Sequence, residues 1–310
     1  MNNLIKKHYI FVVLITILAV ISSFAQTKKP SKPQVKKPVT QVSSNGLLYK
    51  ISGKKLAKPS YLYGTVHIIC PVDMFAMDKL STYFDQTEGL ILELDMGDAE
   101  VMKKMATALN MPEGKNLKEL LTPEKYAKVD EMFKNIFGVP VEALKAFSPM
   151  GLSVIVSTSP KSIGCQTPAS YEGKFIEMAT KAKKDIEGLE TVEVQMATLA
   201  KTPIEKQAED LYKLSTDPQK AFSQFKELIS SYKLQDSEKL FETMTKLSAE
   251  DPEAMTNLLD ERNADWIPKI ETAIAEKSRF IAVGGGHLGG KTGVVKLLRK
   301  QGYTVTPIKF

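Results

Sequence analysis

Histidine, cysteine and tryptophan are scarce in this chain of 310 residues, which holds three, two and one of them. Neither cysteine has a second cysteine nearby, so a cysteine-bound zinc ion is not expected. In an oxidising compartment Cys70 and Cys165 could pair, but the sequence supplies no geometry that decides this. Beyond the N-terminal stretch, no apolar run approaches the roughly 20 residues that a membrane-spanning helix needs.

Acidic residues are absent from the first 45 positions, which contain seven lysines. Subtracting these seven positive charges from the net charge of +6 leaves a net charge of −1 for the rest of the chain. The basic balance therefore belongs to the N-terminal segment and not to a folded surface. Nucleic-acid binding loses its main support, and we expect no nucleic-acid partner.

The N-terminus has the order of a secretory signal peptide. Lys6 and Lys7 precede an apolar run over residues 9–20, and small residues follow at Ser23 and Ala25. We expect cleavage after Ala25, and the alternative is an uncleaved anchor. A periplasmic or extracellular protein without a stable membrane span after cleavage is the predicted product.

A linker is predicted between the leader and the folded body. Residues 26–45 are rich in lysine and proline and contain nothing that could build a core. The predicted organisation is therefore a signal peptide over residues 1–25, a linker over residues 26–45 and a folded body over residues 46–310. The sequence leaves the oligomeric state of this body open.

Strand patterns stand at both ends of the body, and helical patterns fill the middle. The strand segments share β-branched and aromatic residues and cover residues 47–51, 60–69, 89–95, 186–191, 279–283 and 303–306. Thr122-Pro123 and Asp251-Pro252 are typical helix starts. We expect an α/β (or α+β) fold with a central mixed sheet from the N- and C-terminal segments and a large helical insert over about residues 100–270.

Both histidines of the body occur in the same local pattern. His67 ends the run Gly64-Thr-Val-His67, and His287 ends Gly284-Gly-Gly-His287, each at or just past a predicted strand. A glycine there lets the backbone approach closely or take a positive φ, which suits an imidazole that projects into a cleft. We expect the two motifs to meet in one site. The alternative is two unrelated histidines with separate partners.

Two acidic residues and one arginine stand in unusual positions. Glu93 and Asp95 are two residues apart in a predicted strand, so both would point to one face, as metal ligands, as proton-transfer groups or on a solvated face. Arg262 falls on the apolar stripe of a predicted helix and needs a carboxylate or an oxyanion as partner, unless it reaches solvent from the stripe edge. Glu172 and Glu190 are weaker candidates.

A glycine-rich run after the last motif imitates a phosphate-binding loop. Residues 285–292 have the spacing of an ATP-binding loop between a predicted strand and a predicted helix. Only 18 residues follow Thr292, too few for the further strands that a nucleotide-binding fold requires. We therefore reject ATP binding, although an anion such as a substrate carboxylate could bind at the start of that helix.

These motifs together resemble the TraB/GumN family, which is related to the Tiki metalloproteases, the erythromycin esterases and the haem-binding ChaN proteins. The resemblance covers residues 46–310. It is carried by the order and spacing of several short motifs: Tyr63-Gly-Thr-Val-His67, Glu93, Gly188-Leu-Glu-Thr191 with Gln195, Arg262-Asn263 and Ala282-Val-Gly-Gly-Gly-His287-Leu-Gly289.

The resemblance implies a metal-assisted hydrolase site. His67, Glu93 and His287 would bind a divalent ion (Mn, Co, Zn or Fe), Arg262 would stabilise developing negative charge, and Asn263 would be a secondary member. Many relatives carry an aspartate after a glycine in the middle segment, where this chain has Glu172 in a different context.

Three functional hypotheses follow from the motifs and the resemblance. The first is an exported metal-dependent hydrolase, a Tiki-like peptidase, acting on a peptide or small-molecule substrate. The second is a non-enzymatic haem or metal binder resembling ChaN. The third is a metal-independent hydrolase of the esterase type with His67 as general base.

Overall fold

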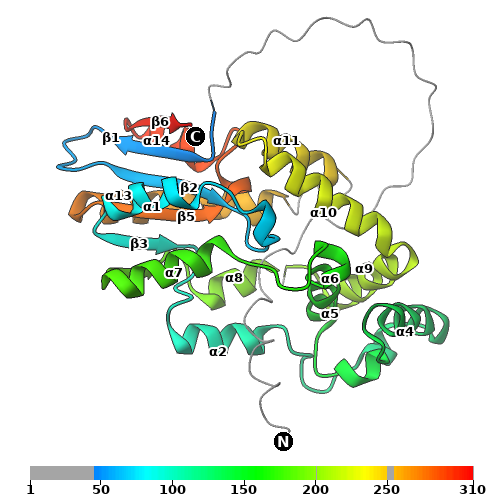
Figure 1. The fold of residues 1–310 in the computed structure, drawn as a ribbon. Coiled ribbons are helices and arrows are strands. Elements are labelled where there is room, and N and C mark those ends of the chain that lie inside the picture. Colours follow the sequence, from blue (N-terminus) through cyan, green and yellow to red (C-terminus); the bar gives the residue numbers. More distant parts are fainter. Residues whose placement is uncertain (1–44, 200, 250–254, 310) are drawn as a thin grey trace, which may run out of the picture.

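The computed structural model describes residues 45–199, 201–249 and 255–309 (Figure 1). The predicted signal peptide, residues 26–44 of the predicted linker and the helix start at Asp251-Pro252 lie outside these ranges. Within them, no helix is both long enough and apolar enough to cross a membrane.

Strands from both ends of the body form one six-stranded mixed sheet in the order β4-β3-β5-β2-β1-β6. The neighbours β4, β3, β5 and β2 pair in parallel, whereas β1 pairs antiparallel with β2 and β6. The predicted α/β fold with a mixed sheet is confirmed. The strands are β1 (Leu48–Ser52), β2 (Ser60–Thr65), β3 (Gly89–Leu92), β4 (Asp185–Gly188), β5 (Arg279–Gly284) and β6 (Thr304–Ile308).

The burial of each strand agrees with its place in the sheet. All residues of β2, β3 and β5 are buried, as expected for parallel strands that are covered on both faces. Strand β6 instead lies at the edge of the sheet, and its exposed and buried residues alternate at first. Pro307 lacks an N–H group, and an edge strand tolerates this loss.

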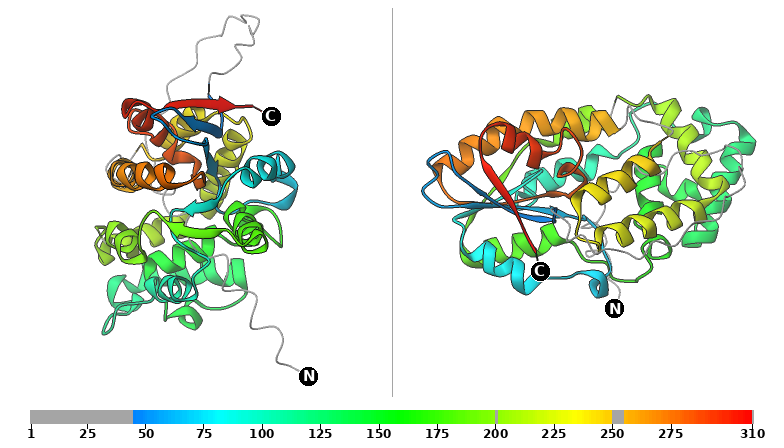
Figure 2. Two further views of the ribbon diagram at one scale, coloured as in Figure 1. Left: turned by 90° about the vertical axis from the view of Figure 1, so that its left-hand side faces the viewer. Right: turned by 90° about the horizontal axis from the view of Figure 1, so that it is seen from above.

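Helices cover both faces of the sheet (Figures 1 and 2). Trp266 and Ile270 of α13 and Val294 of α14 pack on one face with Ile281. The other face is covered by aromatic and aliphatic side chains of four further helices. The helices are α13 (Glu261–Glu276) and α14 (Val294–Lys300) on the first face, and α1 (Met77–Asp85), α7 (Tyr171–Ala182), α10 (Pro218–Tyr232) and α11 (Ser237–Leu247) on the second.

The long segment between β3 and β5 is mainly helical, as predicted, although β4 interrupts it and joins the sheet edge. Part of it has a core of its own, in which Phe133 and Leu152 pack with Leu211. Thr122 caps α4 by accepting a hydrogen bond from the Lys125 N–H. Its remaining helices are α2 (Ala99–Ala108), α3 (Leu117–Leu120), α4 (Pro123–Phe137), α5 (Pro149–Ser157), α6 (Pro160–Ile163), α8 (Val192–Leu199) and α9 (Ile204–Thr216).

Three strands end earlier than the sequence predicts. Strand β2 ends at Thr65 instead of Ile69, β3 at Leu92 instead of Asp95, and β4 at Gly188 instead of Thr191. Strand β5 ends at Gly284, which pairs with Thr65, so β2 has no partner in β5 beyond this residue. The pairing of β3 with β5 ends at Leu92, opposite Ala282. His67 and Glu93 therefore lie in the turns that follow the strands.

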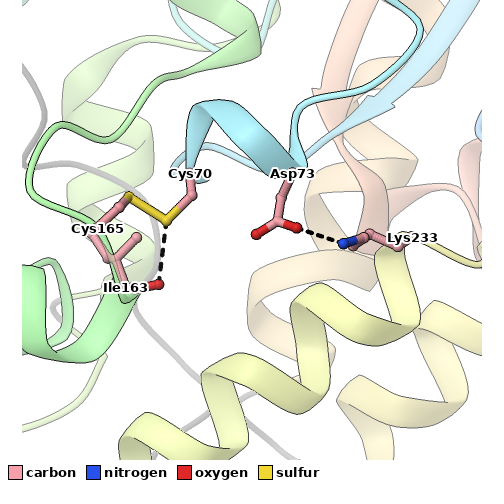
Figure 3. Close-up of a disulfide and its surroundings, with 5 residues drawn as sticks. All are labelled: Cys70, Asp73, Ile163, Cys165 and Lys233. Carbon is pink, nitrogen blue, oxygen red and sulfur yellow. Dashed lines mark hydrogen bonds and ion pairs between the residues drawn. A yellow bond between two sulfur atoms is a disulfide. The ribbon is translucent and has the colours of Figure 1, made fainter.

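The cysteine pairing that the sequence left open is made in the structure. Cys70 and Cys165 form a disulfide, and their Cα atoms lie 5.9 Å apart (Figure 3). The bond joins the turn after β2 to the segment before α7. Ile69 and Ala169 exchange two backbone hydrogen bonds beside it.

The glycine that opens the first motif is predicted to be required for packing. A Cβ on Gly64 would lie 2.5 Å from Leu288 Cδ1 and 2.9 Å from Gly285 Cα, so the β2–β5 region would have to shift. We expect G64A to lower the free energy of unfolding by about 1–3 kcal/mol, measured by chemical denaturation.

Gly173 provides the matched control, because a Cβ there would have no contact closer than 3.8 Å. Since Gly173 lies in helix α7, G173A should raise the free energy of unfolding by up to about 1 kcal/mol. Equal stability of G64A and the wild type would contradict the close approach at Gly64.

Candidate active site

The candidate site lies at the carboxyl ends of the four parallel strands. Glu190 follows β4, Glu93 follows β3, His287 follows β5 and His67 follows β2. These strands are adjacent in the order β4-β3-β5-β2, so their ends open on one edge of the sheet. Ligands of open α/β sheets bind at this edge.

The two motif histidines face the same carboxylate oxygen. His67 Nε2 lies 3.7 Å from Glu93 Oε1, and His287 Nε2 lies 3.8 Å from that same atom. The side chains of Glu93 and His287 are buried, whereas His67 is 16% exposed. The candidate site is therefore most accessible on the His67 side.

Gly284 occupies the space between these groups. Its backbone N–H donates to Glu93 Oε1 over 2.7 Å. A Cβ at this position would lie 3.1 Å from His67 Nε2 and 3.2 Å from Glu93 Oε1. A side chain at the first residue of the second motif would therefore require His67 or Glu93 to move by a few tenths of an ångström, and glycine lets the two imidazoles and the carboxylate keep these positions.

The outer nitrogen of each imidazole has a partner. His67 Nδ1 lies 2.7 Å from Glu172 Oε1, and His287 Nδ1 lies 2.6 Å from Asn263 Oδ1. Asn263 Nδ2 donates to the backbone carbonyl of Thr292, which leaves Oδ1 as the acceptor for His287. The hydrogen-bond network thus assigns a proton to Nδ1 in both rings, so that Nε2 of a neutral ring carries its lone pair towards Glu93.

Glu172 is held by the start of helix α7. Ser170, the N-cap residue, donates from Oγ to Glu172 Oε2 over 2.8 Å, and Thr65 Oγ1 donates to Oε1. A carboxylate in the first helical turn is also favoured by the helix dipole. The long segment between β3 and β5 therefore supplies the acidic partner of His67.

Arg262 joins the two acidic strand ends. Its Nη2 donates to Glu93 Oε2 and Glu190 Oε1, over 2.6 Å in each case, and its Nε donates to Glu190. Nη1 contacts the carbonyl of Leu258 and lies 3.2 Å from His287 Nε2. All five N–H groups of the guanidinium are thereby directed at acceptors of the protein.

A π-helical turn over Thr256–Asp260 leads into α13 and presents Arg262 to the site. The carbonyl of Leu258 in this turn accepts one hydrogen bond from the guanidinium. Such turns are frequent at functional sites because the extra residue changes the direction of the side chains that follow.

Glu190 has two further donors besides Arg262. Trp266 Nε1 donates to Glu190 Oε2 over 3.2 Å, and Gln195 Nε2 donates to Oε1 over 3.1 Å. Trp266 is not among the site residues that the sequence predicts, so this contact is found only in the structure. The sequence did contain a signal for it: a buried indole N–H needs an acceptor, and Trp266 lies one helical turn after Arg262, so both side chains could share one carboxylate.

Asp95 does not share a face with Glu93, and this part of the sequence prediction is wrong. Strand β3 ends at Leu92, so the two-residue strand period does not apply beyond it. Asp95 instead accepts a hydrogen bond from the Gly97 N–H in the following turn. Of the two acidic residues, Glu93 is the one that contacts the histidines and Arg262.

Burial and charge act in opposite directions on the acidic groups. Burial alone would raise the pKa of Glu93, but Arg262 and the two histidines outweigh it and hold this pKa well below its usual value. Burial would also raise the pKa of Glu172, but the electrostatic interaction with His67 and the hydrogen bonds from His67 and Thr65 outweigh it and lower this pKa. Burial keeps the pKa of Glu190 raised despite Arg262.

The two imidazoles differ in their charge behaviour. Burial lowers the pKa of His287 to about 3, so this ring is neutral. Burial would also lower the pKa of His67, but the carboxylates of Glu172 and Glu93 outweigh it and raise this pKa. Glu93 and Glu190 share the guanidinium of Arg262, whereas the charge partner of Glu172 is His67.

The donor set has the chemistry of a metal site but not its finished geometry. Two imidazole Nε2 atoms and one carboxylate oxygen converge, which is a combination that suits Zn, Mn, Fe or Co. Arg262 Nη1 nevertheless faces the lone pair of His287 Nε2. Across residues 45–199, 201–249 and 255–309, no group of three or more His, Cys, Asp or Glu side chains is arranged as a formed metal cluster.

The glycine-rich run after the second motif is packed against helix α11. A Cβ on Gly290 would lie 2.6 Å from Phe241 Cζ, and the Gly290 N–H points to the carboxylate of Glu238. A carboxylate thus lies where a phosphate-binding loop would present an N–H group to phosphate. The rejection of ATP binding agrees with these contacts.

An α/β fold with two glycine-led histidine motifs, a buried glutamate and a buried arginine at one sheet edge defines the class of this protein. The chain belongs to the TraB/PrgY/gumN family, whose model matches residues 47–307. The resemblance inferred from the motifs is therefore confirmed.

Two curated relatives share part of the sequence. The zebrafish (Danio rerio) protein Metalloprotease TIKI2 is 28% identical over 106 residues, which is 34% of this chain and 20% of the relative. Metalloprotease TIKI1 from the same organism is 30% identical over 90 residues, 29% of this chain and 18% of the relative. The matched part thus spans about a fifth of each relative's length. No solved structure matches the chain.

Acid should destabilise the fold through His287. The unfolded chain protonates this histidine near pH 6.5, whereas the folded chain does so only near its lowered pKa of about 3. The part of the free energy of unfolding that comes from the neutral His287 is therefore fully present above about pH 6.5 and is lost as the pH falls from about 6.5 towards 3. In H287Q the free energy of unfolding should fall less steeply between about pH 6 and 4, by up to about 1.4 kcal/mol per pH unit.

H67Q is the control for this measurement, which uses denaturant titrations at a series of pH values. The raised pKa of His67 stabilises the folded state below the unfolded value and loses this effect as the pH rises. H67Q should therefore change the pH dependence above about pH 6.5 and, because His67 lowers the pKa values of Glu172 and Glu93, below about pH 5 as well. The two variants are compared between about pH 6 and 5, where H67Q should leave the slope unaltered. Identical acid slopes for H287Q and the wild type would contradict a buried neutral His287.

Proposed function

We propose that this chain is an exported metal-dependent hydrolase, a Tiki-like peptidase that acts on a peptide or small-molecule substrate. The Cys70–Cys165 disulfide is consistent with an oxidising compartment and supports export. The limited similarity to two proteins named as metalloproteases supports the reaction class.

One observation carries the proposal: the Nε2 atoms of His67 and His287 converge on one oxygen of Glu93. The hydrogen bonds from Nδ1 to Glu172 and to Asn263 orient the rings, as outer partners do for metal-bound histidines. The excess of buried carboxylates over guanidinium groups adds an electrostatic reason for a cation to bind here.

His67, Glu93 and His287 would hold the ion. A divalent cation there would polarise a carbonyl group and lower the pKa of bound water to about 7. Glu172, ionised and in contact with His67, would keep the Nδ1 proton in place. Asn263 would do the same for His287.

Arg262 would have two tasks in this proposal. Its contacts with Glu93 and Glu190 keep Glu93 ionised and in position. The expected interaction with a substrate oxyanion requires a free N–H group, and Nη1, which now faces His287 Nε2, is the donor that would be released if His287 took another partner.

The hydrogen bond of 2.7 Å between Glu172 and His67 favours a second candidate function. A carboxylate that holds Nδ1–H leaves Nε2 as a proton acceptor, which is the arrangement of a general base. A metal-independent hydrolase of the esterase type would use this pair alone. The haem-binding hypothesis stays a prediction, and a visible absorption band on haem titration, lost in H67A, would support it.

Metal dependence is tested by removing and restoring divalent ions. We expect the purified full chain to cleave a peptide library only after Mn, Co, Zn or Fe is restored, and elemental analysis to find the ion. H67A, H287A and E93Q should abolish this activity because each removes one proposed ligand. D95N is the control, since Asp95 points away to Gly97, and it should keep wild-type activity. Full metal-dependent activity in H67A would overturn the proposal.

The outer partners distinguish the two candidate functions. In the metal-dependent mechanism, E172A and N263A should each lower metal affinity by about 10–100-fold, because they orient equivalent imidazoles. In the metal-independent mechanism, chelation would leave the rate unchanged, and E172A alone would lower it. Isothermal titration with Co and the rate in the presence of a chelator measure the two effects.

A further inference from the structure

The turn that carries His67 is fixed mainly by contacts outside the sheet. Cys70 bonds to Cys165, and Ile69 exchanges backbone hydrogen bonds of 2.9 and 2.7 Å with Ala169. Asp73 forms an ion pair with Lys233, the residue that follows the last residue of α10 (Figure 3). Each of these partners belongs to the segment between β3 and β5.

The disulfide stands beside the pair of side chains that opens the candidate site. Cys70 follows His67 by three residues, and Cys165 precedes Glu172 by seven. The disulfide, the Ile69–Ala169 backbone pairing and the contact between His67 and Glu172 therefore follow one another along the same two segments.

Other, non-covalent contacts join the same two segments. Thr65 Oγ1 donates to Glu172 Oε1, and Tyr171 exchanges hydrogen bonds with the backbone of Phe75. His67 and Glu172 are 105 residues apart in the chain, and their side chains are 16% and 14% exposed. Asp73 and Lys233 form a further anchor of the turn, but their side chains are 29% and 49% exposed, and solvated ion pairs contribute little. The disulfide is the covalent link that keeps the two segments in register.

We propose that the Cys70–Cys165 disulfide positions Glu172 against His67, so that the site is complete only in the oxidised protein. This inference rests on the proposed function in that it assigns His67 and Glu172 to an active site, but the contact itself can be measured without metal or substrate. Cys70 and Cys165 are positioning residues in this proposal and touch no reacting group.

The second histidine provides an internal comparison. His287 lies beside Trp266, with ring centroids 4.3 Å apart, and its partner Asn263 comes from the same helix as Trp266. Both His287 and Asn263 are buried. Their contact involves neither segment joined by the disulfide, so it should persist when that bond is broken.

Proton NMR of the full chain tests the proposal through the imidazole N–H groups. A ring N–H bonded to a carboxylate or amide oxygen exchanges slowly and resonates downfield, and H67Q and H287Q assign the two signals. Dithiothreitol gives two electrons and two protons to the cystine, which becomes two thiols while the reagent becomes a cyclic disulfide. We expect loss of the His67 signal on reduction and in C70A/C165A, with the His287 signal retained.

K233Q is the matched control, because it removes another anchor of the same turn and leaves the disulfide intact. It should keep both signals. Persistence of the His67 signal after reduction would overturn the proposal, as would its absence from the oxidised wild type. Loss of both signals together would show general unfolding in place of selective positioning and would also overturn it. Loss in K233Q would mean that any loosening of the turn suffices, which contradicts a specific role of the disulfide.

These outcomes are independent of catalysis. If the His67 signal responds as expected but no metal or hydrolysis is found, the positioning inference stands and the proposed function fails. If metal-dependent hydrolysis is found but the signal survives reduction, the proposed function stands and the positioning inference fails.

Discussion

The structure of the candidate site depends on one buried guanidinium. Arg262 lies between Glu93 and Glu190, which are 4% and 8% exposed, and without it both carboxylates would be buried without a full charge partner. Breaking a buried ion pair by removing one partner typically costs about 3–5 kcal/mol, so this arrangement leaves little freedom to the strand ends that carry the two acids. Because Glu93 is held in this way, its other oxygen remains available to the two motif histidines.

The sheet order makes this arrangement possible. Strand β5 lies between β3 and β2, so the turn after it, with Gly284 and His287, comes between the turns that carry Glu93 and His67. Gly284 then serves as the contact point, because its N–H reaches Glu93 and its missing side chain leaves room for His67 Nε2. Two short motifs more than 200 residues apart in the sequence become one site through a single parallel pairing of β2 with β5.

The segment between β3 and β5 contributes more to the site than a cover for the sheet. The sheet ends supply the two histidines and Glu93, whereas this segment supplies the groups that orient them: Glu172 for His67, Asn263 for His287 and Arg262 with Glu190 for Glu93. Two functions are thereby separated in the chain. Groups that could contact a ligand follow β2, β3 and β5, and groups that set their charge and direction come from the helices, apart from Glu190, which follows β4.

The sequence by itself determined the fold class, the family and the main members of the site, because buried parallel strands, helix caps and glycine-led motifs leave local patterns of residues. It also indicated that Arg262 needs a partner. Only the tertiary structure decided which carboxylates these are, that β3 ends before Asp95, and that Glu172 and Trp266 belong to the network. The physical reason is that local periodicity reports which side of an element is buried, whereas hydrogen-bond partners, strand ends and the Cys70–Cys165 pairing depend on neighbours that are distant in the chain.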